Sequence, residues 1–157
     1  MIRKLALACA AGFFACAASA SETYGDWTYE ETQNPLTDEW TWTARTENAD
    51  DGFFAIQCDS IGLRVTVRTD SEDAHFQSTR RVSYGFDRRL THVSTWSNVD
   101  ADKGGGAVVE GKEAKRIARL AARGRKFLYR SEADTVTFSL KGSAKAISRV
   151  ADKCKYL

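Results

Sequence analysis

Apolar and polar residues alternate along several segments of the chain. A period of two places one set of side chains on one face of a β-strand and the other set on the opposite face. One apolar and one polar face is typical of antiparallel strands that lie over a core. The segments with this pattern are residues 40–44, 54–58, 61–67, 82–86, 91–97 and 135–140. Polar stretches short enough for hairpin connections lie between several of them, at residues 59–60, 87–90 and 131–134.

Two later segments change to the helical period. The first covers about residues 110–122, and the second begins at Ser143, which we expect to be its N-cap. Apolar residues of the second segment fall on one stripe, which consists of Ala146, Ile147, Val150, Ala151 and Cys154. The combined pattern predicts an α+β fold: an antiparallel β-sheet or sandwich with two short helices in the C-terminal half.

The N-terminus has the composition of an export signal. A positive start (Met1 to Lys4) precedes an apolar stretch at residues 5–16, and the small residues Ala18 and Ala20 mark a cleavage site before Ser21. We therefore expect a signal peptide at residues 1–20 and a single exported α+β domain at residues 21–157, in the periplasm or secreted. A lipoprotein acylated at Cys16 is the alternative. No apolar run after the signal is long enough to span a membrane.

Cysteine usage agrees with export. Cys9 and Cys16 leave with the signal, and Cys58 and Cys154 remain as one pair in an oxidising compartment. Each of these two lies on an inferred apolar face, so both thiols are expected to point toward the core and to form a disulfide. Free thiols and a metal site are the alternatives, although His75 and His92 show no ligand spacing relative to the cysteines.

The sequence contains no recognisable catalytic, metal or cofactor motif. Residues 106–113 match the phosphate-loop pattern G-x-x-x-x-G-K, but Glu113 replaces the hydroxyl residue that would hold Mg²⁺. We interpret the string as a glycine turn, a short strand and a helix start. Neither histidine lies in a nucleophile or metalloenzyme signature. The four tryptophans are interpreted as core aromatics, with a sugar-stacking surface as the alternative. We assign no catalytic residue, metal or cofactor.

Charge is distributed very unevenly. Residues 21–79 hold 13 acidic and 3 basic residues, whereas residues 80–157 hold 18 basic and 8 acidic residues. At 100° per residue, five cations of the first predicted helix fall within a narrow arc opposite its apolar residues. These cations are Lys112, Lys115, Arg116, Arg119 and Arg123. The arc is either a solvated face whose charges the acidic half balances or a docking face for an anionic partner.

Several short strings resemble the periplasmic VasI-like family associated with type VI secretion. They are residues 35–38 (PLTD), 56–58 (IQC), 84–87 (YGFD), 96–97 (WS) and 138–140 (FSL) with Gly142, and a helix that ends at Cys154. The chain departs from the family pattern at Gly85, where a basic residue is expected, and in its last four residues. The resemblance implies a small exported accessory protein without established catalytic residues.

These observations lead to three functional hypotheses. The first is a non-enzymatic periplasmic protein that binds another envelope component, in particular a protein, and serves as a secretion-system accessory. The alternative is a binder of anionic glycan or lipid through the basic helix at residues 112–123. The third is a small hydrolase. Export argues against nucleic acid as a partner.

Overall fold

The chain folds into one large antiparallel sheet. The computed structural model describes residues 19–50, 52–69, 78–99, 106–132 and 135–157; the predicted signal residues before Ser19, with Cys9 and Cys16, and also His75 lie outside these ranges. Within the described residues the sheet has ten strands in the order β1-β2-β3-β4-β5-β8-β7-β6-β9-β10. They are β1 (Ser19–Tyr24), β2 (Trp27–Gln33), β3 (Trp40–Glu47), β4 (Phe53–Cys58), β5 (Leu63–Arg68), β6 (Thr79–Phe86), β7 (Arg89–Asn98), β8 (Ala107–Glu110), β9 (Lys126–Arg130) and β10 (Thr135–Ser139).

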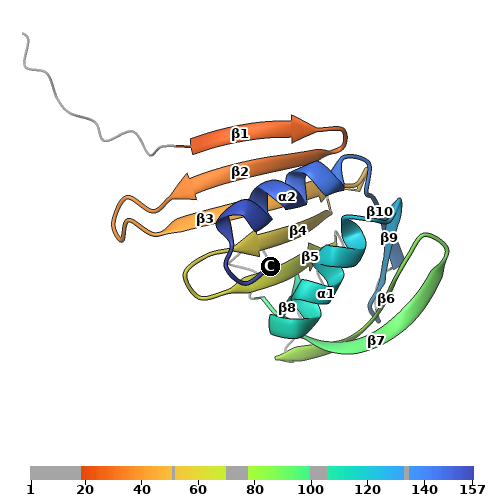
Figure 1. The fold of residues 1–157 in the computed structure, drawn as a ribbon. Helices are drawn as coiled ribbons and strands as arrows, with labels where there is room; N and C mark the ends of the chain where they lie inside the picture. Colours follow the sequence, from red (N-terminus) through yellow and green to blue (C-terminus); the bar gives the residue numbers. More distant parts are fainter. Residues whose placement is uncertain (1–18, 51, 70–77, 100–105, 133–134) are drawn as a thin grey trace, which may run out of the picture.

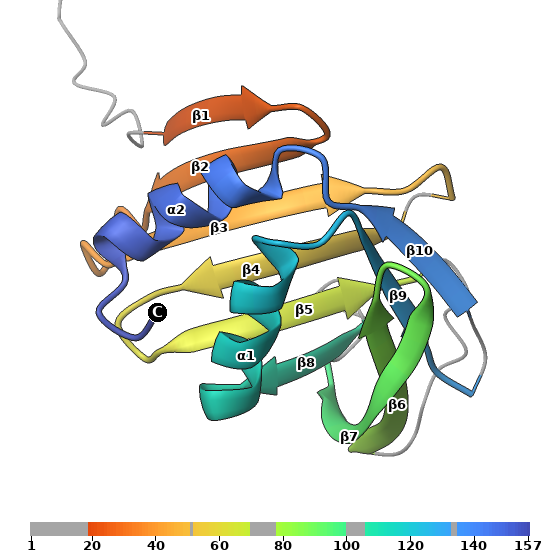
Figure 2. The same ribbon diagram turned by 45° about the vertical axis from the view of Figure 1, so that its right-hand side comes forward.

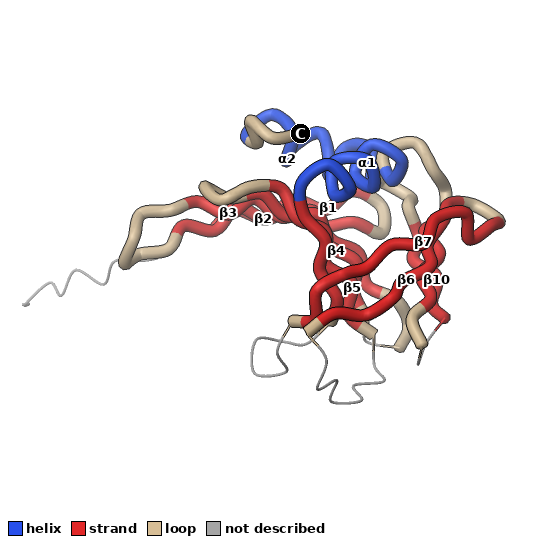
Figure 3. The backbone as a smooth tube through the Cα atoms, turned by 90° about the horizontal axis from the view of Figure 1, so that it is seen from below, coloured by secondary structure: helices blue, strands red, loops and turns tan. Residues whose placement is uncertain are grey.

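The sheet bends beneath two helices, α1 (Gly111–Ala121) and α2 (Ser143–Lys153). Strands β1 to β5 form a meander, and β8 then pairs with β5 on one side and β7 on the other. Both helices lie over the same face of this sheet, with α2 across β2 and β3 and α1 across β5 and β8 (Figures 1 and 2). Seen from below, the strands curve from β3 through β4 and β5 toward β6, β7 and β10 (Figure 3). The expected antiparallel sheet with two short helices in the C-terminal half is therefore confirmed.

Aromatic side chains from distant strands meet inside the bend. Phe54 of β4 stacks on Phe127 of β9, with ring centroids 4.3 Å apart, and also contacts the rings of Trp27 and Phe138. The indole of Trp27 donates to the carbonyl oxygen of Ser139, which ties β2 to the end of β10. These contacts hold strands β2 and β4 against strands β9 and β10 across the bend of the sheet. Trp27 and Trp96 are fully buried, whereas Trp40 and Trp42 are only half-buried.

The first helix begins and ends within one residue of the predicted limits. Its small and aliphatic residues pack on the sheet, and the buried ones are Ala114, Ile117, Ala118 and Ala121. Leu120 is half-buried. The preceding string, which matched the phosphate-loop pattern, forms strand β8 and the first turn of α1. Because residues 107–110 pair within the sheet, their backbone does not wrap around a ligand as a phosphate loop does.

The second helix differs from the expectation at two positions. Ser143 is its first residue rather than its N-cap, and Gly142 occupies the cap position in a left-handed conformation with φ 96°. The Ser143 hydroxyl lies 2.8 Å from the carbonyl oxygen of Ala121 and 2.7 Å from that of Leu140, so it links the start of α2 to the end of α1. The predicted apolar stripe holds at Ala146, Ile147, Val150 and Cys154, but Ala151 is exposed.

The turn between β4 and β5 is longer than predicted. The carboxylate of Asp59 accepts the backbone N–H groups of Ile61 and Gly62, which closes a turn over residues 59–62. Ile61 was expected to share the buried face of Leu63 and Val65, but it lies at the tip of this turn with 82% of its surface exposed. The alternation therefore starts at Leu63, and Ile61 is an exposed apolar side chain without a place in the core.

Candidate functional site

The five predicted cations line one groove: four lie on the outer face of α1, and Arg123, predicted to belong to the helix, lies just beyond its end at Ala121. Lys112, Arg116, Arg119 and Arg123 are exposed and Lys115 is half-buried. We call these five residues the basic face. They border a shallow groove of about 590 Å³, together with Leu120 and His92 of β7. No acidic side chain is among the residues that line this groove.

Arg116 is the member of the basic face with an acidic neighbour. Its guanidinium lies 3.7 Å from the Glu113 carboxylate, which also accepts a hydrogen bond from the hydroxyl of Tyr84. Tyr84 is fully buried, and burial raises its pKa above the ordinary value, as does the bond to Glu113. A guanidinium nitrogen of Arg116 also lies 2.8 Å from Nδ1 and 3.0 Å from Nε2 of His92, and because arginine can only donate, the imidazole is the acceptor. This network holds α1 on the β6–β7 hairpin.

The other four cations of the basic face make no ion pair with any residue that the structure describes. The acidic residues with ion pairs in the first half of the chain contact other cations, namely Arg45, Arg64 and Arg149. The described part of the acidic half therefore does not neutralise the basic face. Instead, the positive charge of α1 stands next to solvent.

A second group of cations continues the positive surface beyond the end of α1. Asp87, in the β6–β7 turn, accepts the backbone N–H groups of Arg125 and Lys126 at 2.7 and 3.3 Å. This contact brings the turn against the segment that links α1 to β9. The exposed cations gathered there, which we call the turn cluster, are Arg88, Arg89, Arg125 and Lys126. Sequence reasoning missed Arg88 and Arg89 as neighbours of the helix, although their position in a predicted hairpin turn marks them as exposed.

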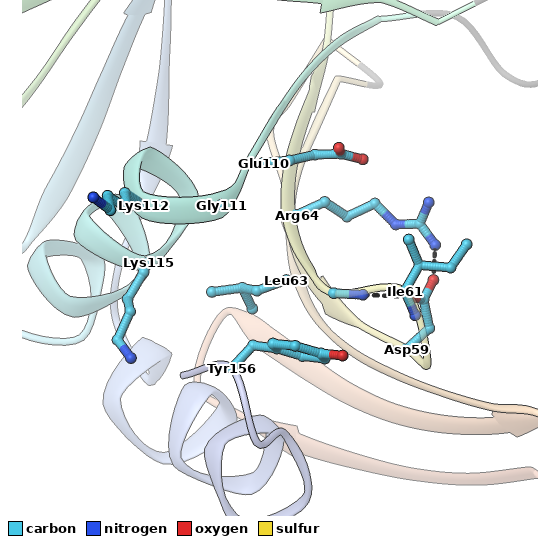
Figure 4. A pocket seen from close by; sticks show the side chains of 10 residues that line it. Asp59, Ile61, Leu63, Arg64, Glu110, Gly111, Lys112, Lys115 and Tyr156 are labelled. Atoms are coloured by element: carbon cyan, nitrogen blue, oxygen red, sulfur yellow. Dashed lines mark hydrogen bonds and ion pairs between the residues drawn. The ribbon is translucent and has the colours of Figure 1, made fainter.

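An apolar pocket of about 610 Å³ opens beside the first turn of α1. Figure 4 shows Lys112 and Lys115 on one side of it, the β4–β5 turn with Ile61 on the other, and Leu63 and Tyr156 between them. The remaining charged groups on its lining are Asp59 and Arg64, which form an ion pair, and Glu110. The pocket thus shares Lys112 and Lys115 with the groove of the basic face.

The cysteine pair holds the C-terminal segment whose Tyr156 lines this pocket. The sulfurs of Cys58 and Cys154 are 2.06 Å apart, the length of a disulfide bond, and join the end of β4 to the residue that follows α2. Two residues later the Tyr156 hydroxyl donates to the carbonyl oxygen of Ser60 at 3.3 Å. Both contacts place the C-terminal segment on the β4–β5 turn, so Tyr156 forms one wall of the pocket.

Two further sequence candidates for chemistry are a metal site and His92. They contain no group of three or more histidine, cysteine, aspartate or glutamate side chains placed to hold a metal. His92 faces arginine rather than a nucleophile, and its groove is lined mainly by cations. Within the described ranges, neither helix has the length and apolar character needed to cross a bilayer.

Comparisons with known proteins add no relative to this picture. No protein-family model matches the chain, and neither the curated proteins nor the solved structures compared with it gave a match.

Proposed function

We propose that this protein is an exported, non-enzymatic binding protein that docks onto a negatively charged component of the cell envelope through the basic face. One observation carries the proposal: three cations of α1 and Arg123 just beyond its end, all exposed or half-buried, line one groove without an ion pair among the described residues. Like charges at i,i+4 on a helix destabilise it by about 0.2–0.5 kcal/mol per pair. A bound polyanion relieves this repulsion.

The shape of the basic face favours an extended anion over a single small one. From Lys112 to its end at Ala121, α1 rises about 14 Å, at about 1.5 Å per residue, and Arg123 follows in the next segment. The turn cluster begins two residues later, at Arg125, and lengthens the positive track. A chain of glycan carboxylates or phosphates, or a layer of lipid head groups, presents several negative charges over such a length. We therefore favour an anionic glycan or lipid as the ligand.

A charge reversal with a matched control tests this proposal. Lys115→Glu with Arg119→Glu changes the net charge by the same amount as Lys145→Glu with Lys153→Glu on the exposed face of α2. We expect the first pair to lower retention on immobilised polyphosphate about tenfold or more, and the α2 pair to change it little. Added salt should weaken wild-type retention, because exposed charges are screened beyond about 10 Å at 0.1 M ionic strength. Equal effects of the two pairs would contradict a role for the basic face.

A protein partner is the second candidate, and the sheet edge at β1 favours it. β1 is the first strand in the sheet order and pairs only with β2 among the described strands, so its other side is open to strand addition. A photo-crosslinking residue at exposed Thr23 of β1, with Leu36 as the exposed control position, would capture such a partner in intact cells. Capture of an envelope protein at Thr23 alone would favour strand addition. A captured component of a type VI secretion system would support the accessory role that the resemblance implies.

A further inference from the structure

We propose that the apolar pocket beside α1 binds the acyl chain of an anionic lipid whose head group lies on the basic face. This inference rests on the proposed function, because it names the ligand class that the basic face would take. The pocket and the groove of the basic face share Lys112 and Lys115, so an apolar surface adjoins a cationic surface at these two lysines. A molecule that carries a negative head next to a hydrocarbon chain is complementary to both.

The lining of the pocket suits a hydrocarbon chain. Ile61 is 82% exposed at the tip of the β4–β5 turn, and it faces the pocket together with Leu63 and Tyr156. The volume of about 610 Å³ falls within the range of about 300–1,000 Å³ that is usual for small-molecule sites. A glycan chain has no apolar segment to fill such a space. This difference selects lipid over glycan.

The charges around the pocket select a negative head group. Asp59 is neutralised by its ion pair with Arg64. Figure 4 shows the Glu110 side chain pointing away from Lys112 and Lys115, toward the side of Arg64. Lys112 and Lys115 line the end of the pocket that joins the basic face, and neither makes an ion pair among the described residues. The N-terminus of α1, where Glu110 makes no side-chain capping bond, adds its positive dipole end there.

Gly62 allows a variant that fills the pocket without disturbing the fold. A Cβ atom built on Gly62 meets nothing within 4 Å, and its φ is not in the left-handed region. Because Gly62 also lines the pocket, Gly62→Trp should place an indole there. A second variant, Ile61→Glu, puts a negative charge on the wall opposite the lysines. Its matched control is Leu36→Glu, which changes an equally exposed side chain in the turn between β2 and β3.

Calorimetric titration with dodecanoate tests the inference. Acetate, which lacks the hydrocarbon chain, and dodecyltrimethylammonium, whose head group is positive, are the controls. We expect the wild type to bind dodecanoate and neither control. Gly62→Trp and Ile61→Glu should each weaken dodecanoate binding about tenfold or more, whereas Leu36→Glu should not. Gly62→Trp should leave retention on polyphosphate unchanged.

Two results would overturn the lipid assignment. One is a wild type that does not bind dodecanoate, and the other is binding that Gly62→Trp leaves undiminished. In either case, a loss of polyphosphate retention on reversal of Lys115 and Arg119 would still support the proposed function. If that double reversal changes neither dodecanoate binding nor polyphosphate retention, the pocket still binds a hydrocarbon chain, but both the docking face and the position of the head group on it are wrong.

Discussion

Replacing Cys58 and Cys154 together by alanine removes the covalent link between β4 and the residue that follows α2. The linked residues are 96 positions apart, so the bond closes a loop that includes most of the described chain. In the unfolded state such a cross-link restricts the chain far more than in the folded state. Its removal should therefore lower the free energy of unfolding.

The chain-entropy model gives the size of this effect. A loop of about 100 residues corresponds to about 4.7 kcal/mol at 25 °C, and native disulfides in small exported domains contribute about 2–5 kcal/mol. Both cysteines are buried, at 1% and 5% exposure, so alanine also leaves a small gap in the packing. We expect a loss of about 3–5 kcal/mol. That is a large part of the total of about 5–15 kcal/mol typical of a domain.

Guanidinium unfolding of the oxidised protein measures this loss. Tryptophan fluorescence is a suitable signal because Trp27 and Trp96 are fully buried in the folded state. The dependence of the unfolding free energy on denaturant should become steeper in the variant, since its unfolded state is less compact and exposes more surface. Wild-type protein unfolded under reducing conditions should behave like the variant.

Two outcomes would refute this reasoning. Alkylation of unreduced, denatured protein at both Cys58 and Cys154, identified by mass spectrometry of the peptides, would show that the bond does not form. A loss below about 1 kcal/mol, with the bond shown to be present, would mean that the loop constraint does not govern stability.

The remaining predictions concern the backbone, the alkaline limit of stability and the pocket. A Cβ on Gly142 would lie 1.7 Å from the carbonyl oxygen of Tyr24, so Gly142→Ala should cost at least about 1–3 kcal/mol in denaturant unfolding, whereas Gly62→Ala should cost much less. Burial raises the pKa of Tyr84, as does its bond to Glu113, so its contribution to stability is full below the ordinary tyrosine pKa of about 10 and falls as the pH rises above it. Tyr84→Phe should make the decline of the unfolding free energy with rising pH shallower by up to about 1.4 kcal/mol per pH unit. Urea unfolding at several alkaline pH values measures this slope, and an unchanged slope would exclude the effect. Reduction of the disulfide should weaken dodecanoate binding more than polyphosphate retention, because the C-terminal segment forms a wall of the pocket; equal losses in the two assays would speak against this.

Local patterns were sufficient for much of the fold. The alternation in residues 54–58 and 82–86 predicts strands that the structure contains, and the helical period predicts α1 to within one residue at each end. These predictions hold because side-chain direction repeats over two residues in a strand and 3.6 in a helix, which is a property of the local backbone. The placement of four of the five cations on one face of α1 follows from the same geometry, whereas the helix ends before Arg123.

Other local expectations were wrong where a contact from elsewhere in the chain decided the outcome. Ser143 has the side chain of an N-cap, but its hydroxyl meets the carbonyl oxygen of Ala121 at the end of α1, and Gly142 takes the cap position. Ile61 fits the alternation of apolar and polar residues that predicts β5, but it lies in a turn whose backbone N–H groups donate to the Asp59 carboxylate. Strands β1 and β2 are rich in polar residues. Because they contain few apolar side chains, the alternation of apolar and polar residues did not predict them.

The amino-acid sequence by itself determined several of the antiparallel strands, the two helices and the narrow arc of cations, because each depends on residues close together in the chain. Only the tertiary structure decided where these elements meet. It brought Tyr156 onto the β4–β5 turn and the first turn of α1 beside it, which created the apolar pocket, and it placed Arg88 and Arg89 next to Arg125. These neighbours are separated by tens of residues, and their proximity depends on how the bent sheet and the cysteine pair close the chain on itself, which no local period encodes.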